Sequence, residues 1–326
     1  MTRPERGDDA PTVAVIAGGV GAARFLRGLV RVVDPSDITA IVNTGDDTVL
    51  HGLHVSPDLD TIVYTLAGAI DPERGWGLVD ETWSAMRALE RYAAIRPAGS
   101  TAAPTWFNLG DQDLATHFYR TARLAEGATL TTVTGEIARA WGLGLTVLPM
   151  TDDGFRTRIE TAEHGTVDFQ DYFVRLRHDV AVRAVEFVHD ARPTASVLDA
   201  LGTADVVVIA PSNPLVSVGP VRALPGIDAL LRSRRDSVVA ISPIVGGAAL
   251  KGPADRMLAE LGHEATAVGV ARLYREIAAT LVVDDVDAAL AGEIEATGIR
   301  PRVTATVMAD AEVAAALARI VLAAAS

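Results

Sequence analysis

The amino-terminal part of the chain alternates apolar runs with a glycine-rich turn and an amphipathic segment. Residues Thr12–Ala17 form a β-branched apolar run, the turn Gly18-Gly19-Val20-Gly21 follows, and apolar positions then recur at helical spacing through Val33. A second short apolar run covers Ile38–Val42. A strand, a loop, a helix and a second strand in this order predict the start of a parallel sheet.

The carboxy-terminal half repeats this alternation. Its short apolar runs predict strands over Val206–Ile209, Val238–Ile241, Ala265–Val268 and Thr280–Val283. Helices are expected over Arg222–Arg232, near Pro253–Leu261, and as an amphipathic helix over Ala311–Ala325. The pattern predicts an α/β fold, a Rossmann-like doubly wound sheet that is mostly parallel, with helices on both faces.

The middle of the chain departs from this rhythm. Helical spacing is seen over Glu81–Tyr92, Asp113–Ala125 and Thr134–Trp141. Strand-like runs without long helices between them cover Thr146–Pro149, Arg156–Thr161, Val167–Val174 and Val182–Val188. We therefore expect residues 71–189 to be a helical and antiparallel insertion, and residues 12–70 and 190–326 to form a nucleotide-binding core.

Composition narrows the class of protein. A content of 49% hydrophobic and 22% charged residues is typical of a globular chain, and the net charge of -13 disfavours nucleic acid and anionic membranes as partners. With no cysteine, disulfides, Cys-based zinc sites and thiol nucleophiles are excluded. No signal-peptide core or membrane-length apolar run is present, so we expect a cytoplasmic protein.

An acidic segment without Lys or Arg follows the second predicted strand. It carries Asp46, Asp47, Asp58 and Asp60. Crowded carboxylates raise one another's pKa, and Mg²⁺, which prefers oxygen ligands, would relieve that repulsion. Because ligands of open α/β sheets bind at the carboxyl ends of strands, Asp46 or Asp47 is expected to reach the same crevice as the glycine turn. A solvated acidic loop is the alternative, and Asp58 or Asp60 could instead cap the helix expected over Ile62–Ala69.

The glycine turn has two features that suit a phosphate. Glycines at positions 18, 19 and 21, on either side of Val20, allow close approach of the backbone, and the following helix offers unpaired N–H groups. Arg24 stands where a dinucleotide fingerprint has its third glycine, and no G-K-[ST] follows. The second strand leads into Asn43 rather than an acid for the ribose, which disfavours an NAD-dependent oxidoreductase. A tight turn without a ligand is the other possibility.

Two further loops are expected at the same edge of the sheet. Ser212-Asn213-Pro214 follows a predicted buried strand, and the Asn213 amide could bind a base or a ribose, although a simple turn would use the same residues. Lys251, the single lysine of the chain, lies among glycines before a predicted helix, where it could pair with a phosphate or be a surface charge.

A polar segment at residues 106–117 is the candidate for contacts with a polar substrate. It contains Asp111, Gln112, Asp113 and His117. Asp113 could instead cap the helix that follows, and His117 could be an ordinary helix-face histidine. Trp76 and Trp83 could stack on a flat heterocycle, with a core position as the alternative for Trp83.

Taken in order, the motifs resemble those of one known family. They read AGGVGAARFL, VNTGDD, HGLHVSPDLDT, RGWGLVDETW, GDQDLATH, LPMTDD, APSNPLVSVGP and SPIVGG…KGPAD, and they extend over about Val13 to Asp310. The set resembles the 2-phospho-L-lactate transferase family of coenzyme F420 biosynthesis, and most closely its actinobacterial, phosphoenolpyruvyl-transferring members.

The resemblance implies an enzyme. Such an Mg²⁺-dependent transferase moves a phosphoenolpyruvyl or 2-phospho-L-lactyl group from a diphospho-5'-guanosine donor to the ribityl hydroxyl of the deazaflavin Fo. It forms dehydro-F420-0 or F420-0 and releases GMP. A homodimer with a Rossmann-like core is implied as well, with residues 71–189 contributing to the deazaflavin site.

The resemblance also suggests roles for individual residues. Asp60 matches the Fo-binding aspartate of the P-D-L-D-T motif, and Asp111, Gln112 and Asp113, with His117 nearby, match a second Fo contact in which many members have Arg where this chain has Gln112. The nucleotide side is expected to comprise Gly18, Gly19, Val20, Gly21, Asn43, Ser212, Asn213, Pro214 and Lys251. Asp46, Asp47 and Asp60 are the expected Mg²⁺ ligands, with Asp47 and Asp60 catalytic. Whether Asp60 is a ligand or a base is left open.

A second family shares part of this pattern. Regulatory nucleotide-sugar-binding proteins of the gluconeogenesis-factor type share the glycine loop and the D-D turn, but lack the P-D-L-D-T and G-D-x-D motifs. A chemical assay with the deazaflavin and the guanylylated donor would separate the two possibilities.

Overall fold

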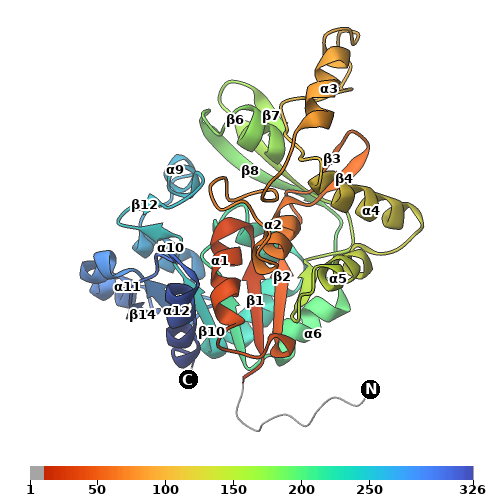
Figure 1. Cartoon of the computed structure of the whole chain (residues 1–326). Coiled ribbons are helices and arrows are strands. Elements are labelled where there is room, and N and C mark those ends of the chain that lie inside the picture. The colour runs from red at the N-terminus through yellow and green to blue at the C-terminus, as the bar shows by residue number, and fades with distance from the viewer. Residues whose placement is uncertain (1–10, 326) are drawn as a thin grey trace, which may run out of the picture.

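A seven-stranded parallel sheet is the centre of the molecule in the computed structural model, which describes residues 11–325 (Figure 1). Its spatial order is β14 (Arg300–Val303), β13 (Thr280–Val283), β10 (Val238–Ile241), β9 (Val206–Ile209), β1 (Val13–Ala17), β2 (Ile38–Val42) and β5 (Thr146–Pro149). The chain builds the sheet outward from β1 in both directions, as a doubly wound fold does. The predicted fold class is confirmed.

Side chains of the central strand alternate between two buried faces. Ala14 and Ile16 pack in one apolar cluster, while Val13, Val15 and Ala17 pack in a second on the other side of the sheet. All five are at most 1% exposed. Burial on both faces explains why this strand is a continuous apolar run instead of an alternation of polar and apolar positions.

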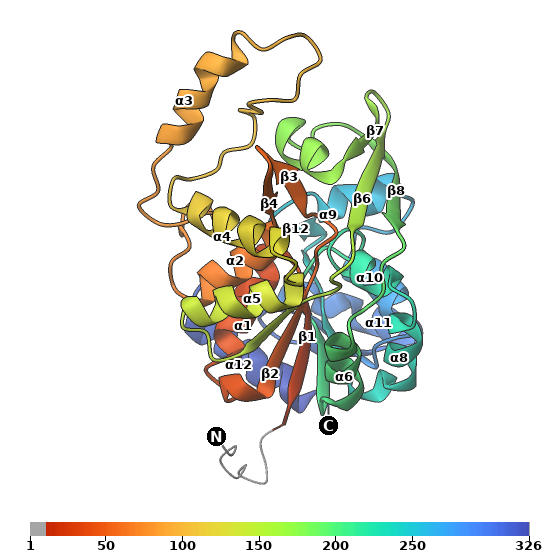
Figure 2. The same cartoon turned by 90° about the vertical axis from the view of Figure 1, so that its right-hand side faces the viewer.

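Helices cover both faces (Figure 2). One face packs against α1 (Gly19–Leu29), α2 (Pro57–Leu66), α5 (Leu130–Ala140) and α12 (Ala311–Ala323). The other packs against α6 (Ala195–Thr203), α7 (Val218–Ala223), α8 (Ile227–Ser233), α9 (Ala254–Glu260), α10 (Ala267–Tyr274) and α11 (Ala291–Ala296). Helices α1 and α12 approach closely at Gly28, where a Cβ would lie 2.3 Å from the carbonyl carbon of Ala314.

Several smaller elements lie beyond the carboxyl ends of the parallel strands. They are the hairpin β3 (Thr48–Leu50) and β4 (Leu53–Val55), the pair β11 (Ile244–Val245) and β12 (Ala248–Ala249), and the antiparallel sheet β7-β6-β8 (Gly165–Asp168, Phe155–Thr161 and Val182–His189). Helix α3 (Ser84–Ala93) projects from the body on a long arm that returns to α4 (Asp113–Ala125) (Figure 2). These elements surround the candidate site.

Four expectations about individual elements were wrong. Residues 146–149, expected among the antiparallel strands, form β5 and pair in parallel with β2. Residues 265–268 lead into α10, because the Thr266 side chain caps a helix there. The single helix expected over Arg222–Arg232 is two helices separated at Gly226, and the strand expected through Val174 ends at Asp168 and is followed by a π-helical turn over Asp171–Arg175. The division into a core and an insertion stays a prediction.

None of the helices within residues 11–325 combines the length and the apolar character that a membrane crossing requires.

Candidate active site

A cavity of about 690 Å³ opens at the carboxyl ends of the parallel strands. Loops after β1, β9 and β10 supply Gly18, Ser212 and Ser242 to its wall, and the loop after β2 supplies Asp46. This is the edge at which doubly wound sheets bind ligands. The structure therefore brings the glycine turn, the acidic segment and the 211–214 loop to one place, as the sequence predicted.

The glycine turn packs tightly against the loop after β9. The Ser212 hydroxyl donates to the carbonyl of Gly18 at 2.8 Å, and Gly19 has a positive φ of 69°. A Cβ on Gly21 would lie 2.2 Å from the carbonyl oxygen of Pro211, so this position accepts only glycine without movement of one loop. The turn runs into the first residues of α1, and Gly19, Val20 and Gly21 line the cavity. The first N–H groups of a helix have no partner within it, and here the N–H of Gly19 donates to Asp58.

The predicted nucleotide residues differ in their access to the cavity. The glycine turn, Ser212, Asn213 and Lys251 line it. Asn213 uses its Oδ1 to accept from the backbone N–H of Leu215 at 2.9 Å, so its carbonyl oxygen stabilises the turn. Pro214 and Asn43 are not part of the wall. Asn43 is fully buried, and it occupies the position at the end of β2 where an NAD-binding protein has an acid for the ribose.

Four carboxylates gather where the β3–β4 hairpin meets α2. Asp46, Asp58 and Asp60 are between 6% and 8% exposed, and the side chain of Asp47 is 11% exposed. Oδ1 of Asp46 and Oδ1 of Asp47 are buried without a hydrogen-bond partner. Burial raises the pKa of both groups well above the usual value, and the charge of Asp58 adds to the effect. Burial also raises the pKa of Asp58 to about 6.

Unpartnered acidic oxygens are suited to a divalent cation, although among the described residues the set of three that brings its ligand atoms within 4.8 Å of one another is Asp60, Asp113 and His117. Two unpartnered carboxylate oxygens and mutually repelling acids are costly in a protein interior, and a hard cation would satisfy both. The Ser56 hydroxyl, which donates to Oδ2 of Asp47 at 2.7 Å, fixes that carboxylate and leaves its Oδ1 free.

Asp58 has a different role from the helix cap that was one expectation. Helix α2 begins at Pro57, five residues earlier than predicted, and its N-cap is Ser56. The Asp58 carboxylate instead accepts from Nδ2 of Asn43 at 2.9 Å and from the backbone of Gly19. It thereby connects β2, α2 and the glycine turn.

Asp60 is paired with a buried arginine that sequence reasoning missed. Arg120, on α4, is 1% exposed and is among the largest fully buried side chains of the described residues. Its Nη1 donates to Oδ2 of Asp60 at 3.1 Å, and its Nη2 donates to Oδ1. Such a two-pronged pair fixes both the position and the plane of the carboxylate.

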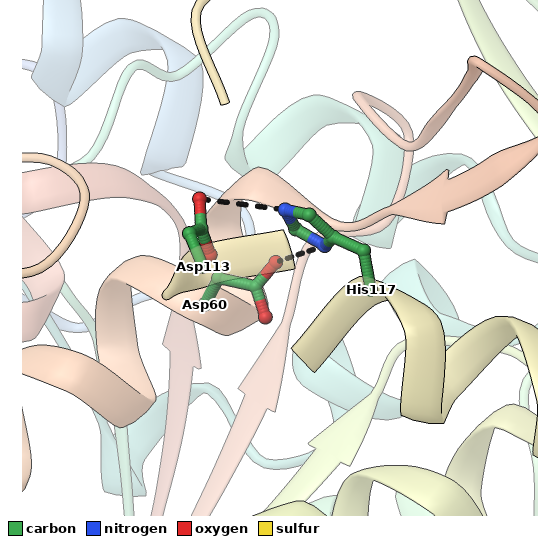
Figure 3. Close-up of side chains that lie close together, drawn as sticks. All are labelled: Asp60, Asp113 and His117. Carbon is green, nitrogen blue, oxygen red and sulfur yellow. Dashed lines mark ion pairs between the residues drawn. The ribbon is translucent and has the colours of Figure 1, made fainter. Parts of the chain in front are cut away.

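The imidazole of His117 faces two aspartates, one through each ring nitrogen (Figure 3). Its Nδ1 is 3.8 Å from Oδ2 of Asp60, and its Nε2 is 3.4 Å from Oδ2 of Asp113. Because Nη1 of Arg120, 3.3 Å away, can only donate, Nδ1 of His117 accepts and the neutral ring carries its proton on Nε2, facing Asp113. The Tyr64 hydroxyl completes the chain by donating to Oδ1 of Asp113 at 2.6 Å.

These contacts decide what the histidine cluster can do. Atoms of Asp60, Asp113 and His117 lie within 4.8 Å of one another, a spacing compatible with a metal. The two ring nitrogens, however, face different carboxylates, and Asp60 already has Arg120 as its counter-ion. We therefore describe the cluster as a row of buried polar groups along the cavity wall, in which Nε2 of His117 has no hydrogen-bond partner.

The G-D-x-D motif divides between the cavity and the arm. Asp113 and His117 line the cavity, while Asp111 and Gln112 lie outside its wall. The Asp111 carboxylate accepts from the backbone N–H groups of Ser84 and Ala85, both at 2.9 Å, and so caps α3. Glu81 in turn accepts from the N–H groups of Gln112 at 2.7 Å and Asp113 at 3.1 Å, which caps α4.

Lys251 and an aromatic wall close the opposite side. A Cβ on Gly75 would lie 2.6 Å from Nζ of Lys251 and 4.0 Å from a methyl of Val20, so the lysine and the glycine turn both approach Gly75 of the arm. The aromatic wall consists of Trp76, Trp106, Phe107, Phe169 and Phe173. Trp83 lies outside it, with its ring 5.8 Å from that of Trp76.

Sequence reasoning missed Arg120, Tyr64 and Glu81. A signal for Arg120 was present, because Asp113, His117 and Arg120 recur at spacings of four and three residues on one face of a helix. Nothing in the local pattern distinguishes Glu81, whose partners lie about 30 residues away.

Comparison with known proteins gives one family. The family model for 2-phospho-L-lactate transferase CofD matches residues 13–323. Among similar curated proteins is a phosphoenolpyruvate transferase of Streptomyces griseus, 44% identical over 94% of this chain and 96% of the relative. Phosphoenolpyruvate transferases of Kitasatospora aureofaciens (44% identical, 95% and 97% covered) and Mycobacterium marinum (39% identical, 94% and 96% covered) are also similar.

Among solved structures, a UPF0052 family protein of Bacillus halodurans has a similar fold. The TM-score is 0.60 at 18% sequence identity, and the match covers 96% of this chain and 100% of that one. At this identity the likeness supports the fold alone.

Proposed function

Because this chain belongs to the 2-phospho-L-lactate transferase CofD family, and the relatives similar to it include phosphoenolpyruvate transferases, we propose that it performs the corresponding transfer in coenzyme F420 biosynthesis. The donor would be a three-carbon acid joined through a diphosphate to guanosine, and the acceptor the ribityl hydroxyl of the deazaflavin Fo. The names of the relatives favour the phosphoenolpyruvyl donor over the 2-phospho-L-lactyl donor.

The proposed reaction is a phosphoryl displacement. The ribityl oxygen forms a bond to the phosphorus that carries the three-carbon acid, and the bond from this phosphorus to the bridging oxygen breaks. GMP leaves with the bridging oxygen, and the hydroxyl proton passes to an enzyme carboxylate and then to solvent. The products are GMP and dehydro-F420-0, or F420-0 if the donor is the lactyl compound.

The observation that carries the proposal is the meeting of the glycine turn with the acidic cluster at one cavity. Beyond Gly19, whose N–H donates to Asp58, the turn would offer helix N–H groups to a phosphate. Asp46, which lines the cavity, and Asp47, which lies outside its wall, each have an unpartnered buried oxygen. A diphosphate bound at the turn would therefore lie next to carboxylates that need a cation. This combination suits phosphoryl transfer better than hydride transfer.

Asp46 and Asp47 are the residues that would hold Mg²⁺, since Asp60 already has Arg120 as its counter-ion. The bound metal would neutralise charge on the diphosphate and on departing GMP. Lys251 lines the same cavity as the glycine turn and would supply a further positive charge to the donor side.

Asp60, Asp113 and His117 form the acceptor side of the proposed site. The Arg120 pair fixes Asp60 at the wall, where its carboxylate can orient the ribityl hydroxyl or take its proton. The aromatic wall described above suits the flat deazaflavin ring. Asp111 and Gln112 would act indirectly, through the arm that they attach to α4.

The direct test is a reaction of the purified protein with Fo, Mg²⁺ and each guanylylated donor in turn. Mass spectrometry should find GMP and a phosphorylated deazaflavin in equal amounts, with the enolpyruvyl donor faster. Absence of product with both donors would refute the proposal and favour a nucleotide-binding regulatory protein. The implied homodimer is tested separately by sedimentation equilibrium.

A further inference from the structure

Arg120 has unusual surroundings for an arginine. The chain has a net charge of -13, and yet this guanidinium is 1% exposed in the wall behind the cavity. Arginine is rarely buried unless it is paired, and here the partner is Asp60, which lines the cavity. The pair therefore lies at the boundary between the protein interior and the proposed site.

The guanidinium connects three elements. Besides its two bonds to Asp60 of α2, Nη1 lies 3.3 Å from the carbonyl oxygen of His54 in β4 and 3.3 Å from Nδ1 of His117 in α4. The next residue, Thr121, reinforces the link, because its hydroxyl accepts from the backbone N–H of His54 at 2.8 Å. Four donor–acceptor contacts thus determine where the Asp60 carboxylate can lie.

Fold stability is a poor explanation for such a pair. Burying two charges costs several kcal/mol per ion before their attraction is counted, and apolar residues of similar volume often serve the fold equally well. The surrounding acid offsets part of this cost, because the charge of Arg120 also lowers the pKa of Asp47, which burial otherwise raises. A costly, directional pair at a cavity wall is typical of a functional constraint.

We propose that Arg120 is a positioning residue for the transfer, which orients the Asp60 carboxylate toward the acceptor hydroxyl through its two-pronged pair. The inference rests on the proposed function, because Asp60 is assigned to the acceptor side there. Arg120 itself lies behind Asp60 and touches no substrate. A planar fork determines both the position and the plane of a carboxylate, which the single ammonium of a lysine does not.

Two variants separate positioning from charge balance. Arg120→Lys keeps the charge and loses the fork, and we expect a fall in kcat of about 100-fold, the typical cost of a 1 Å misplacement of a reacting group. The KM for the guanylylated donor should stay near the wild-type value, because the donor side does not touch Arg120. Arg120→Ala leaves a buried cavity, and added guanidinium chloride at low millimolar concentration should restore part of the lost rate.

The matched control is Arg123→Ala. Arg123 lies one turn further along the same helix and pairs with Glu136 and Glu126 at the surface. Its removal should leave the transfer rate and the donor KM unchanged. Methylammonium chloride at the same ionic strength is the control for the rescue.

The outcomes are distinct. If the wild type makes no product, the proposed function fails. If the wild type is active and Arg120→Lys retains its kcat within about threefold, the positioning role is wrong while the function stands. Equal rescue of Arg120→Ala by methylammonium and guanidinium would show that only a positive charge is needed, and this result would also overturn the positioning role. Should Arg120→Ala fail to fold, the kcat of Arg120→Lys decides the question alone.

Discussion

The side-chain amide of Asn43 donates a 2.9 Å hydrogen bond to Oδ2 of Asp58, and this bond joins the end of β2 to the first turn of α2. At its other end, Oδ1 of Asn43 accepts from the N–H of Gly45, also at 2.9 Å. One side chain donates and accepts at the same time, which an amide can do and a carboxylate cannot. The acidic cluster is thus assembled around a neutral residue.

Replacing Asn43 by Asp should therefore destabilise the protein. The new carboxylate would face Asp58, whose pKa burial already raises to about 6, so the two groups would either repel each other or have to take up a proton. We expect a loss of about 2–3 kcal/mol in the free energy of unfolding. Urea denaturation in the presence of EDTA measures this loss of unfolding free energy. The exchanged pair Asn43→Asp with Asp58→Asn restores a donor and an acceptor, so it should recover part of the loss. A double variant no more stable than the single one would contradict this account.

The pH dependence of stability should report on Asp46. Burial and the charge of Asp58 raise the pKa of this carboxyl, so its ionised form destabilises the metal-free fold. The wild type in EDTA should lose stability as the pH rises through the folded-state pKa. Asp46→Asn has no charge to bury. Its stability advantage over the wild type should therefore be absent below pH ~4 and grow as the pH rises. Thermal unfolding across the pH range measures the difference.

Magnesium should make the wild type more stable than Asp46→Asn, the reverse of their order in EDTA. At a concentration 100 times its Kd, Mg²⁺ should stabilise the wild type by about 2.7 kcal/mol, and it should stabilise Asp46→Asn much less. Asp199→Asn is the control, because Asp199 is an exposed residue of α6 that is not part of the cavity wall. The same Mg²⁺ response in Asp46→Asn and the wild type would exclude Asp46 from the metal site.

Much of the central sheet could be predicted, because its strands are buried on both faces. The runs Ile38–Val42, Val206–Ile209, Val238–Ile241 and Thr280–Val283 are strands in the structure with those bounds. Residues Ala265–Val268 show the limit of that reasoning. A four-residue apolar run fits a strand or a buried helix equally well, and the bond from Gly269 N–H to the Thr266 hydroxyl decides for the helix.

The site was predictable where its chemistry is local in the sequence. The glycine turn, Asp46 and Asp60 were found because each sits next to a strand end or a helix start. Arg120, the partner of Asp60, was not found from the sequence. It lies 60 residues away from Asp60 and reaches this carboxylate only once α4 packs beside the β3–β4 hairpin. Asp111 was assigned to the substrate for its motif, but its carboxylate is occupied by the backbone of α3.

The hydrogen bonds of the Asp111 carboxylate to the backbone of α3 should hold the arm in place. Asp111→Ala removes the acceptor for Ser84 and Ala85 N–H, so α3 should open more often from its attachment. Limited proteolysis should cut within residues 82–110 much faster than in the wild type. The KM for Fo should rise, because the arm also carries Trp76 to the cavity. Thr101→Ala, at an exposed position in the tip of the arm, should not change either measurement, and unchanged cleavage in Asp111→Ala would contradict the capping role.

The contact between the glycine turn and the loop after β9 gives the last prediction. In Gly21→Ala the new methyl would meet the Pro211 carbonyl at 2.2 Å, and φ at this position is not positive, so the strain would come from crowding alone. Overpacking of this kind costs about 1–3 kcal/mol, and separation of the two loops should also weaken GDP binding.

Two other glycines distinguish this cause from a general glycine effect. Gly202→Ala adds a methyl in open space within α6 and should stabilise the fold by up to about 1 kcal/mol. Gly52→Ala also has open space, but its φ of 77° should cost about 1 kcal/mol without changing GDP affinity. Urea denaturation and calorimetric titration with GDP measure both quantities for all three variants. If Gly21→Ala binds GDP as tightly as Gly52→Ala does, the close packing of the two loops is not what shapes the donor side.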